Sequence, residues 1–268
     1  MSSEPSRLDA LRQTLVGLRS VAVAFSGGAD STLLLAMAHE ALGDKAIAVT
    51  IRSCAFPTSE TEAAVRFCRD RGIRHEVMDF DPLSIPRFAE NPPDRCYHCK
   101  RAIFASICDF ARVQGIAHVI EGSNLDDDGD YRPGRKAIAE LGVKSPLREA
   151  GLAKSDVREC LRELGLDVWR KHSAACLASR FPYGGKITRE GLRRVEEGEA
   201  YVASLLPPDT PLRVRSHGDI ARIEVGASGY DPVVAHRTEI AATLKRIGFR
   251  YVALDLENFR TGRLNEEL

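Results

Sequence analysis

The sequence has no long hydrophobic run and no net charge. Its 268 residues include no stretch of about 18 consecutive apolar residues, the length that a membrane-spanning helix needs. Residues 1–19 are polar and charged and lack the apolar core of a secretory signal. Lys plus Arg and Asp plus Glu both number 38, so bulk charge predicts no attraction to nucleic acid or to a membrane. We therefore expect a cytoplasmic protein with a small-molecule substrate.

The sequence also lacks the even cysteine count of a disulfide framework. It has seven cysteines, and an odd number in a chain without a secretory signal favours reduced thiols, metal ligands or catalytic groups. Two of them form a Cys-x-x-Cys pair, Cys96 and Cys99, and Cys176 lies in a loop-like segment. For the other four, which lie on or beside predicted helices or strands, we expect core packing: Cys54, Cys68, Cys108 and Cys160.

Short apolar runs alternate with helical patterns over the first two thirds of the chain. This alternation is typical of an α/β fold with a doubly wound parallel sheet. The apolar runs predict strands at 21–25, 46–51, 75–80 and 118–122, and the periodic segments predict helices at 8–19, 32–42, 59–71, 100–114 and 154–164.

The pattern changes near residue 170. Residues 212–225 alternate like a β-hairpin with a Gly218-Asp219 turn, after a predicted helix at 188–205 and before a strand at 251–256. We therefore predict two domains, residues 1–170 and a smaller α+β domain at 171–268.

A glycine-rich loop follows the first predicted strand. Gly27 and Gly28 allow the backbone N–H groups to approach an anion, and the following helix directs its positive end to the same place. Ser26 and Ser31 can donate hydroxyl hydrogen bonds, whereas Asp30 would repel phosphate unless a cation such as Mg²⁺ lies between them. The alternative is a glycine turn that only caps a helix. The loop is not a Walker loop, because G-x-x-x-x-G-K-[ST] is absent.

Other polar residues follow the fourth predicted strand. Gly122 and Ser123 lie at its carboxyl end, where ligands bind in such sheets. The acidic run Asp126, Asp127, Asp128 and Asp130 either forms a solvated loop or helps to place Mg²⁺.

The segment Ser26–Ser31, with the sequence SGGADS, resembles the PP-loop superfamily of ATP pyrophosphatases. This resemblance implies an adenine nucleotide alpha-hydrolase fold in which residues 1–170 bind ATP and Mg²⁺. It also implies that ATP is cleaved between its α and β phosphates, that the substrate becomes an adenylate, and that pyrophosphate is released.

Four longer segments are similar to the LarE family of ATP-dependent sulfur transferases. They are NPPDRCYHCK (91–100), EGSNLDDDGDYRPGRKA (121–137), SPLREAGLAKSDVR (145–158) and CLASRFPYGGKIT (176–188). The resemblance implies a pyridinium-3,5-dicarboxylate mononucleotide as substrate. Its carboxylates would be adenylated and converted to thiocarboxylates for nickel-pincer cofactor biosynthesis, with residues 171–268 serving substrate binding and sulfur transfer in a homo-oligomer.

The cysteines leave the sulfur source open. In family members with a lone cysteine, the residue at the position of Cys176 gives up its own sulfur, and the nearby Arg180 would favour its thiolate. Resemblance to other PP-loop thiolating enzymes implies instead that Cys96, Cys99 and Cys176 hold a 4Fe-4S cluster that carries a transferable sulfide. A group of buried thiols or a structural zinc site are the alternatives.

Arg213 and Arg215 alternate on one predicted strand and so face the same side. We predict that they clamp the substrate phosphate, with Arg180 as a further candidate, the alternative being a solvated strand face. Glu199 and Glu224 are predicted to be surface groups.

The sequence leaves three other functions as alternatives. An ammonia-using amide ligase would not need Cys176, a tRNA-thiolating enzyme would need more basic surface, and a nucleotide sensor would bind ATP without releasing pyrophosphate.

Overall fold

The computed structural model describes residues 7–129, 134–171, 175–260 and 262–267. The chain divides into two compact units. Unit 1 comprises residues 1–53, 58–80 and 96–174, and unit 2 comprises 54–57, 81–95 and 175–268. Two short segments of the first 170 residues thus group with unit 2, and the predicted boundary near residue 170 stays a prediction about domains.

Unit 1 contains a four-stranded parallel sheet in the order β3-β2-β1-β4. Its strands are β1 (Val21–Ala24), β2 (Ala46–Arg52), β3 (His75–Asp79) and β4 (His118–Ile120). The helices of this part of the chain are α1 (Arg7–Leu18), α2 (Ala29–Leu42), α3 (Thr58–Asp70), α4 (Arg95–Val113), α5 (Gly134–Glu140), α6 (Pro146–Glu149) and α7 (Lys154–Glu163). The predicted α/β fold with a parallel sheet is confirmed.

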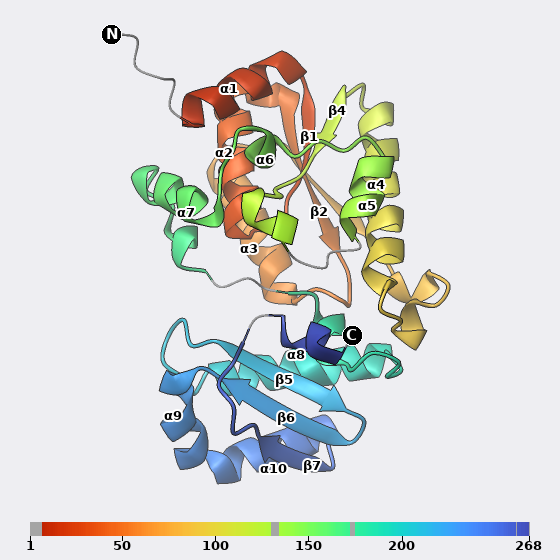
Figure 1. Cartoon of the computed structure of the whole chain (residues 1–268), viewed down its shortest axis with the longest axis vertical. Helices are drawn as coiled ribbons and strands as arrows, with labels where there is room; N and C mark the ends of the chain where they lie inside the picture. Colours follow the sequence, from red (N-terminus) through yellow and green to blue (C-terminus); the bar gives the residue numbers. More distant parts are fainter. Residues whose placement is uncertain (1–6, 130–133, 172–174, 261, 268) are drawn as a thin grey trace. The chain divides into compact units, whose positions relative to one another are not determined.

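The core of unit 1 forms around its two central strands, because β1 is apolar along its whole length and β2 is buried from Ala46 to Thr50. Every residue of β1 except Ala24 is fully buried, as parallel strands covered on both faces require. In Figure 1, α1 and α2 lie on one side of β1 and β2, and α4 lies on the other. Leucines of α1, the apolar face of α2, and Val157 and Leu161 of α7 join in one buried cluster.

The strand order places a ligand site at one point of the sheet. From β1 the chain moves outward through β2 to β3 and then returns to the other side of β1 with β4. The carboxyl ends of β1 and β4 are therefore the topological switch point, where open α/β sheets bind their ligands. Both predicted ligand loops, residues 26–31 and 122–123, begin there.

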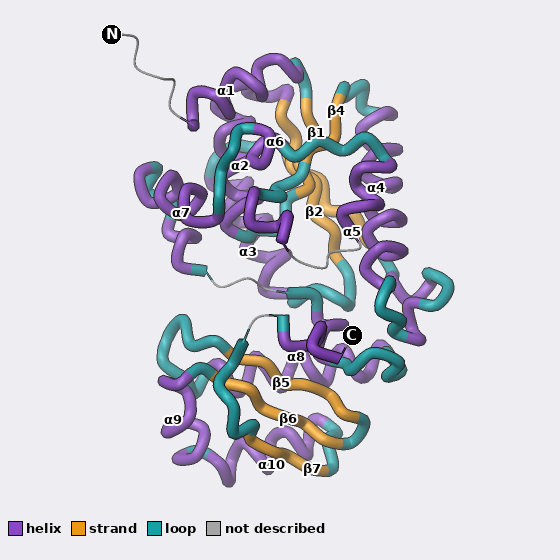
Figure 2. Tube along the Cα trace, in the orientation of Figure 1, coloured by secondary structure: helices purple, strands orange, loops and turns teal. Residues whose placement is uncertain are grey.

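Unit 2 is built on a mixed three-stranded sheet in the order β5-β6-β7. The strands β5 (Leu212–His217) and β6 (Ile220–Val225) form the predicted antiparallel hairpin, and β7 (Tyr251–Leu254) pairs with β6 in parallel. Its helices are α8 (Arg189–Ala203), α9 (Tyr230–Ala235) and α10 (Arg237–Ile247). Figure 2 shows the strands of both units in orange beside their helices.

Three differences from the sequence prediction bear on the site. α2 begins at Ala29, three residues before its predicted start, so Asp30 and Ser31 belong to its first turn. α4 begins at Arg95, so Cys96 and Cys99 lie on a helix. The loop-like segment that contains Cys176 includes a short 3-10 helix at Leu177–Arg180, and residues 172–174 before it lie outside the described chain.

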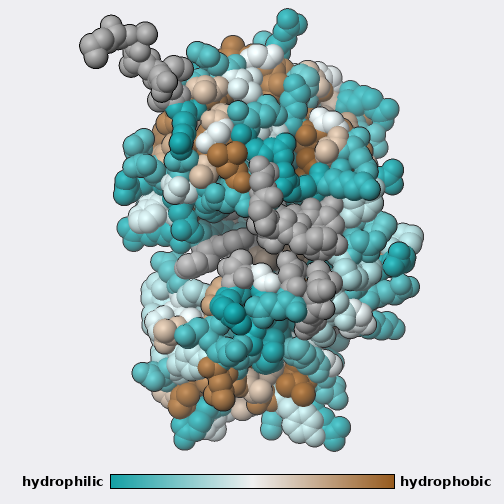
Figure 3. Space-filling view, in the orientation of Figure 1, coloured by the Kyte–Doolittle hydropathy of each residue, from teal (hydrophilic) through white to brown (hydrophobic). Residues whose placement is uncertain are grey.

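No helix in the described ranges is long and apolar enough to cross a membrane. On the face shown in Figure 3, hydrophobic residues gather only in small groups separated by polar ones. Such scattered groups are normal for the surface of a folded protein.

Candidate functional site

The first turn of α2 is open toward the loop that precedes it. Gly28 is the N-cap residue and makes no side-chain capping hydrogen bond, which leaves the first backbone N–H groups of the helix available to an anion. Gly27 has φ +70°, a left-handed conformation that favours glycine. The geometry is therefore that of a phosphate-binding loop.

The two hydroxyls of this loop lie within hydrogen-bonding distance of each other. Ser26 Oγ and Ser31 Oγ are 3.2 Å apart, and Ser31 Oγ donates to the carbonyl oxygen of Gly28 at 3.1 Å. The Ser26 N–H also donates to Ser31 Oγ, at 3.3 Å. These bonds close the loop and bring the two hydroxyl groups together at the start of α2.

Gly122 lies directly against the phosphate-binding loop. A Cβ atom at this position would stand 3.0 Å from Ser31 N and 3.1 Å from Asp30 C. A side chain at this position would therefore force the β4 end and the start of α2 apart by a few tenths of an ångström. Ser123, in contrast, donates both its N–H and its hydroxyl to the buried carboxylate of Glu121, at 3.1 and 2.9 Å.

Asp30 is held by two residues that the sequence analysis did not single out. Asn124 Nδ2 donates to Asp30 Oδ1 at 3.0 Å, and Lys154 Nζ forms an ion pair with Asp30 Oδ2. The carboxylate oxygen atoms suit Mg²⁺, which prefers hard oxygen ligands. The local residues therefore fit a metal ion beside the phosphate loop.

A second lysine contacts the same loop. Lys171 Nζ donates to the carbonyl oxygen of Gly27 at 3.0 Å and to Glu60 Oε2 at 2.6 Å. Within the predicted acidic run, Asp126 Oδ2 accepts from the Lys154 N–H and Asp127 Oδ2 accepts from the Asn124 N–H, both at 3.0 Å. These two carboxylates order the loop after β4; Asp130 of the run lies outside the described residues.

Cys96 and Cys99 lie one turn apart on α4 and so share one face of the helix. Cys96 is half-buried and Cys99 is 8% exposed. In the described ranges, no three His, Cys, Asp or Glu side chains gather as a metal site. Cys176 belongs to unit 2, so the predicted three-cysteine set draws on both units and stays a prediction.

Cys176 caps the 3-10 helix Leu177–Arg180, and its backbone is fixed by Arg180. Arg180 Nη1 donates to the carbonyl oxygens of Ala175 and Cys176 at 2.9 and 3.2 Å. Its Nε and Nη2 atoms contact both carboxylate oxygens of Glu199 at 2.7 and 2.8 Å. Arg180 is only 2% exposed, so these contacts favour a role in positioning Cys176.

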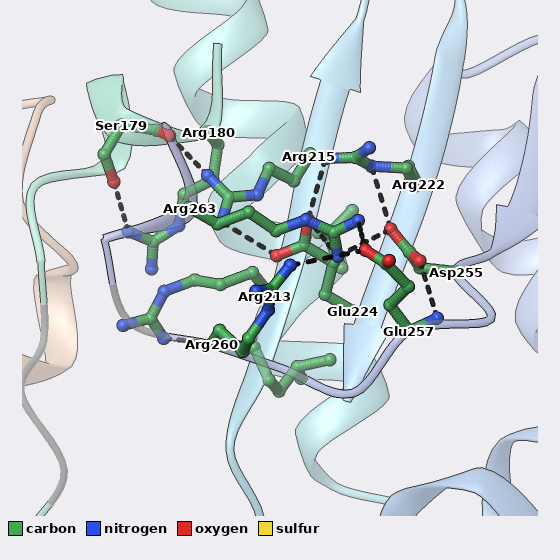
Figure 4. Close-up of polar contacts among 12 residues, drawn as sticks. Ser179, Arg180, Arg213, Arg215, Arg222, Glu224, Asp255, Glu257, Arg260 and Arg263 are labelled. Atoms are coloured by element: carbon green, nitrogen blue, oxygen red, sulfur yellow. Dashed lines mark hydrogen bonds and ion pairs between the residues drawn. The ribbon is translucent and has the colours of Figure 1, made fainter. Parts of the chain in front are cut away.

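Arg213 and Arg215 lie on β5 in a cluster of arginines and carboxylates, shown in Figure 4. Arg215 donates to Ser179 O at 2.9 Å and to Glu224 Oε2 at 2.8 Å. Burial, together with the positive charges of Arg180 and Arg215, lowers the pKa of Arg213 to about 10. A bound anion would relieve this repulsion, so the cluster suits a phosphate group.

The predicted surface position of Glu224 is wrong, and that of Glu199 is largely so. The Glu224 side chain is 0% exposed and the Glu199 side chain 16%. Glu224 accepts from Arg215 and from Arg222 Nη2 at 2.7 Å, and Arg263 lies 3.7 Å away. Each carboxylate is buried because arginine partners compensate for its lost hydration.

The signals for the missed residues were weak. Lys154 and Lys171 are 124 and 144 residues from their partners in the loop, so no local pattern connects them. For Glu224, the predicted hairpin offered a signal, because the pairing of its two strands places Arg213 opposite Glu224.

Comparison with known proteins assigns this geometry to a family. A family model described as asparagine synthase matches residues 8–108. The chain is 39% identical to the pyridinium-3,5-bisthiocarboxylic acid mononucleotide synthase of Lactiplantibacillus plantarum over 269 residues, which is all of this chain and 97% of that protein. It is also 39% identical to an uncharacterized protein of Synechocystis, over 98% of both chains.

A more distant similarity covers part of the chain. The glutamine-hydrolysing GMP synthase of a Ruegeria species is 29% identical over 231 residues, 76% of this chain and 41% of that protein. The full-length identity to the mononucleotide synthase, together with the open phosphate loop at the switch point of the sheet, shows that the chain belongs to the LarE family of ATP-dependent sulfurtransferases within the PP-loop superfamily.

Proposed function

We propose that the protein adenylates the carboxylates of a pyridinium-3,5-dicarboxylate mononucleotide and converts them to thiocarboxylates for a nickel-pincer cofactor. The observation that carries this proposal is the uncapped first turn of α2 beside Asp30, in a chain 39% identical over its full length to a synthase of the bisthiocarboxylic product. The loop fits the phosphates of ATP, and the product named for the relative supports this reaction.

Residues of the phosphate loop would perform the first half-reaction. The N–H groups of α2, with Ser26 and Ser31, bind the phosphates, and Asp30 would hold Mg²⁺, which would supply positive charge to the reacting phosphates. A carboxylate oxygen of the substrate attacks the α-phosphorus, the bond to the β-phosphate oxygen breaks, and pyrophosphate leaves. Gly122 keeps the end of β4 close to this loop, and Ser123 keeps it ordered through Glu121.

Residues of unit 2 would perform the second half-reaction. Arg213 and Arg215 bind the phosphate of the mononucleotide, and Arg180 fixes the backbone of Cys176. A sulfur nucleophile attacks the acyl carbon and AMP leaves with its bonding electron pair. Two such rounds convert the two carboxylates.

Two sulfur sources fit the cysteines. The thiolate of Cys176 could itself attack the acyl carbon; loss of the Cα proton and cleavage of the Cβ–S bond would then leave the sulfur on the substrate as a thiocarboxylate and turn Cys176 into dehydroalanine. Alternatively, Cys96 and Cys99, which share a face of α4, could join Cys176 in holding a 4Fe-4S cluster, which supplies a transferable sulfide when bound. The pair on α4 fits two of the three thiolates that such a cluster needs, and this favours the second source.

Pyrophosphate release tests the first half-reaction. Wild type should release pyrophosphate from ATP only when the mononucleotide is present. Asp30→Asn should lose this release, whereas Cys176→Ala should keep it and fail to make thiocarboxylate. Amide formation from ammonia by Cys176→Ala would instead support an amide ligase, and ATP binding without any pyrophosphate would support a nucleotide sensor.

Anaerobic purification with iron and sulfide analysis tests the sulfur source. A broad brown absorption with about four irons per chain, lost in Cys96→Ala, would support the cluster. An iron-free protein that loses one sulfur and two hydrogens in its intact mass after reaction would assign the sulfur to Cys176. Sedimentation of the same preparation measures the predicted homo-oligomer.

A further inference from the structure

Asp30 already has a cation beside it in the free protein. The ammonium group of Lys154 forms an ion pair with Oδ2 of this carboxylate, while Asn124 donates to Oδ1 at 3.0 Å. The two charged side chains are 32% and 24% exposed, so the pair is partly withdrawn from water. Lys154 thus occupies the coordinating oxygen that a divalent metal ion would use.

The position of Lys154 is fixed by the fold. It is the first residue of α7, and its N–H donates to Asp126 Oδ2 at 3.0 Å. α7 packs against α2 through Val157 and Leu161, both fully buried in the cluster that contains the apolar face of α2. The helix that carries the ammonium is therefore anchored to the helix that carries Asp30.

We propose that Lys154 is a resident counter-ion that excludes divalent metal from Asp30 until nucleotide arrives. When the metal enters with ATP, Lys154 leaves the carboxylate and pairs with the phosphate oxygens, so neither charge is left without a partner. Without nucleotide, displacing Lys154 would leave its ammonium unpaired. Metal and nucleotide must then bind with positive coupling. This inference rests on the proposed role of Asp30 as a metal ligand for ATP.

Lys171 provides a matched control. It is 28% exposed and also contacts the phosphate loop, but through the carbonyl oxygen of Gly27 and through Glu60. Replacing it removes a positive charge of similar exposure near the same loop without touching Asp30. The comparison therefore separates the specific ion pair from a general change in local charge.

The test is Mn²⁺ binding, followed by electron paramagnetic resonance of the free ion, with and without a non-hydrolysable ATP analogue. Without nucleotide, Lys154→Met should bind Mn²⁺ at least about fivefold more tightly than wild type, and Lys154→Met with Asp30→Asn should lose this gain. Lys171→Met should stay within about twofold of wild type. The analogue should tighten Mn²⁺ binding less in Lys154→Met than in wild type, again by about fivefold.

Equal Mn²⁺ affinity in wild type and Lys154→Met would overturn the proposal, as would equal gains in Lys154→Met and Lys171→Met. Lys154→Arg, which keeps the charge, should behave nearly as wild type and guards against a folding defect. Pyrophosphate release by wild type is measured separately. Its absence, with the Mn²⁺ coupling intact, would reject the adenylation chemistry and leave the role of Lys154 standing.

Discussion

Replacing Arg180 by methionine should destabilise the protein by about 3 kcal/mol. Its guanidinium is 2% exposed and binds both oxygens of Glu199, whose side chain is 16% exposed. Methionine fills much of the volume but leaves the carboxylate with only the Val214 N–H, at 2.9 Å, among the bonds described. Breaking a buried pair by removing one partner typically costs about 3–5 kcal/mol, and the partial exposure of Glu199 places the estimate at the lower end.

Urea unfolding followed by circular dichroism measures this loss. Tryptophan fluorescence is less suitable, because the single tryptophan, Trp169, lies in unit 1 and the ion pair lies in unit 2. The midpoint should fall while the slope of free energy against urea stays as in wild type, since the surface exposed on unfolding is unchanged.

A second substitution gives the control. In Arg180→Met with Glu199→Leu, the unpaired carboxylate is gone, so about 1 kcal/mol or more of the lost stability should return. A loss below about 1 kcal/mol in the single variant would refute the reasoning, because it would equal that of an exposed ion pair.

Three further predictions concern a close backbone approach, a buried thiol and a buried amide. Gly122→Ala places a Cβ 3.0 Å from Ser31 N, so calorimetry should show ATP binding weakened by about 1–3 kcal/mol; unchanged affinity would contradict this close approach. Burial raises the pKa of Cys68 to about 12, so iodoacetamide at pH 8.5 should label this thiol only in urea. Because the raised pKa favours the neutral thiol in the folded protein, its contribution to the free energy of unfolding is complete below about pH 9 and should vanish as the pH rises to about 12. Asn91, fully buried, donates to Pro182 O at 2.7 Å, and Asn91→Ala should cost about 1–3 kcal/mol in urea unfolding.

The sequence was sufficient to predict the fold of unit 1 because its signals are local. Apolar runs such as 46–51 and the glycine that follows a helix are visible within a few residues. The start of α4 was missed by five residues, since its first turn, Arg95 to His98, has no apolar periodicity. The strand order β3-β2-β1-β4 depends on which strands pair, and a list of strands does not contain that information.

The phosphate loop could be predicted for the same reason, and its surroundings could not. The residues from Ser26 to Ser31 are contiguous, whereas Lys154, Lys171 and Asn124 reach them across more than 90 positions. Helical and strand periodicity depends on residues within a few positions of one another, so it does not predict such contacts. In unit 2, Arg222 lies two residues from Glu224 on β6, whereas Arg215 lies on β5 and meets Glu224 through the pairing of the two strands, so the burial of Glu224 depends in part on the hairpin register.

The charge distribution explains how a neutral chain can serve anionic ligands. Zero net charge argues against binding a long polyanion, which needs many separate phosphate contacts. It says little about a single phosphate, because that group responds to the few charges within a Debye length of about 10 Å. Around Arg213, the nearby positive charges of Arg180 and Arg215 are strong enough to contribute to its lowered pKa. Local arrangement, and not total charge, therefore determines whether the cluster around Arg213 can bind a single phosphate group.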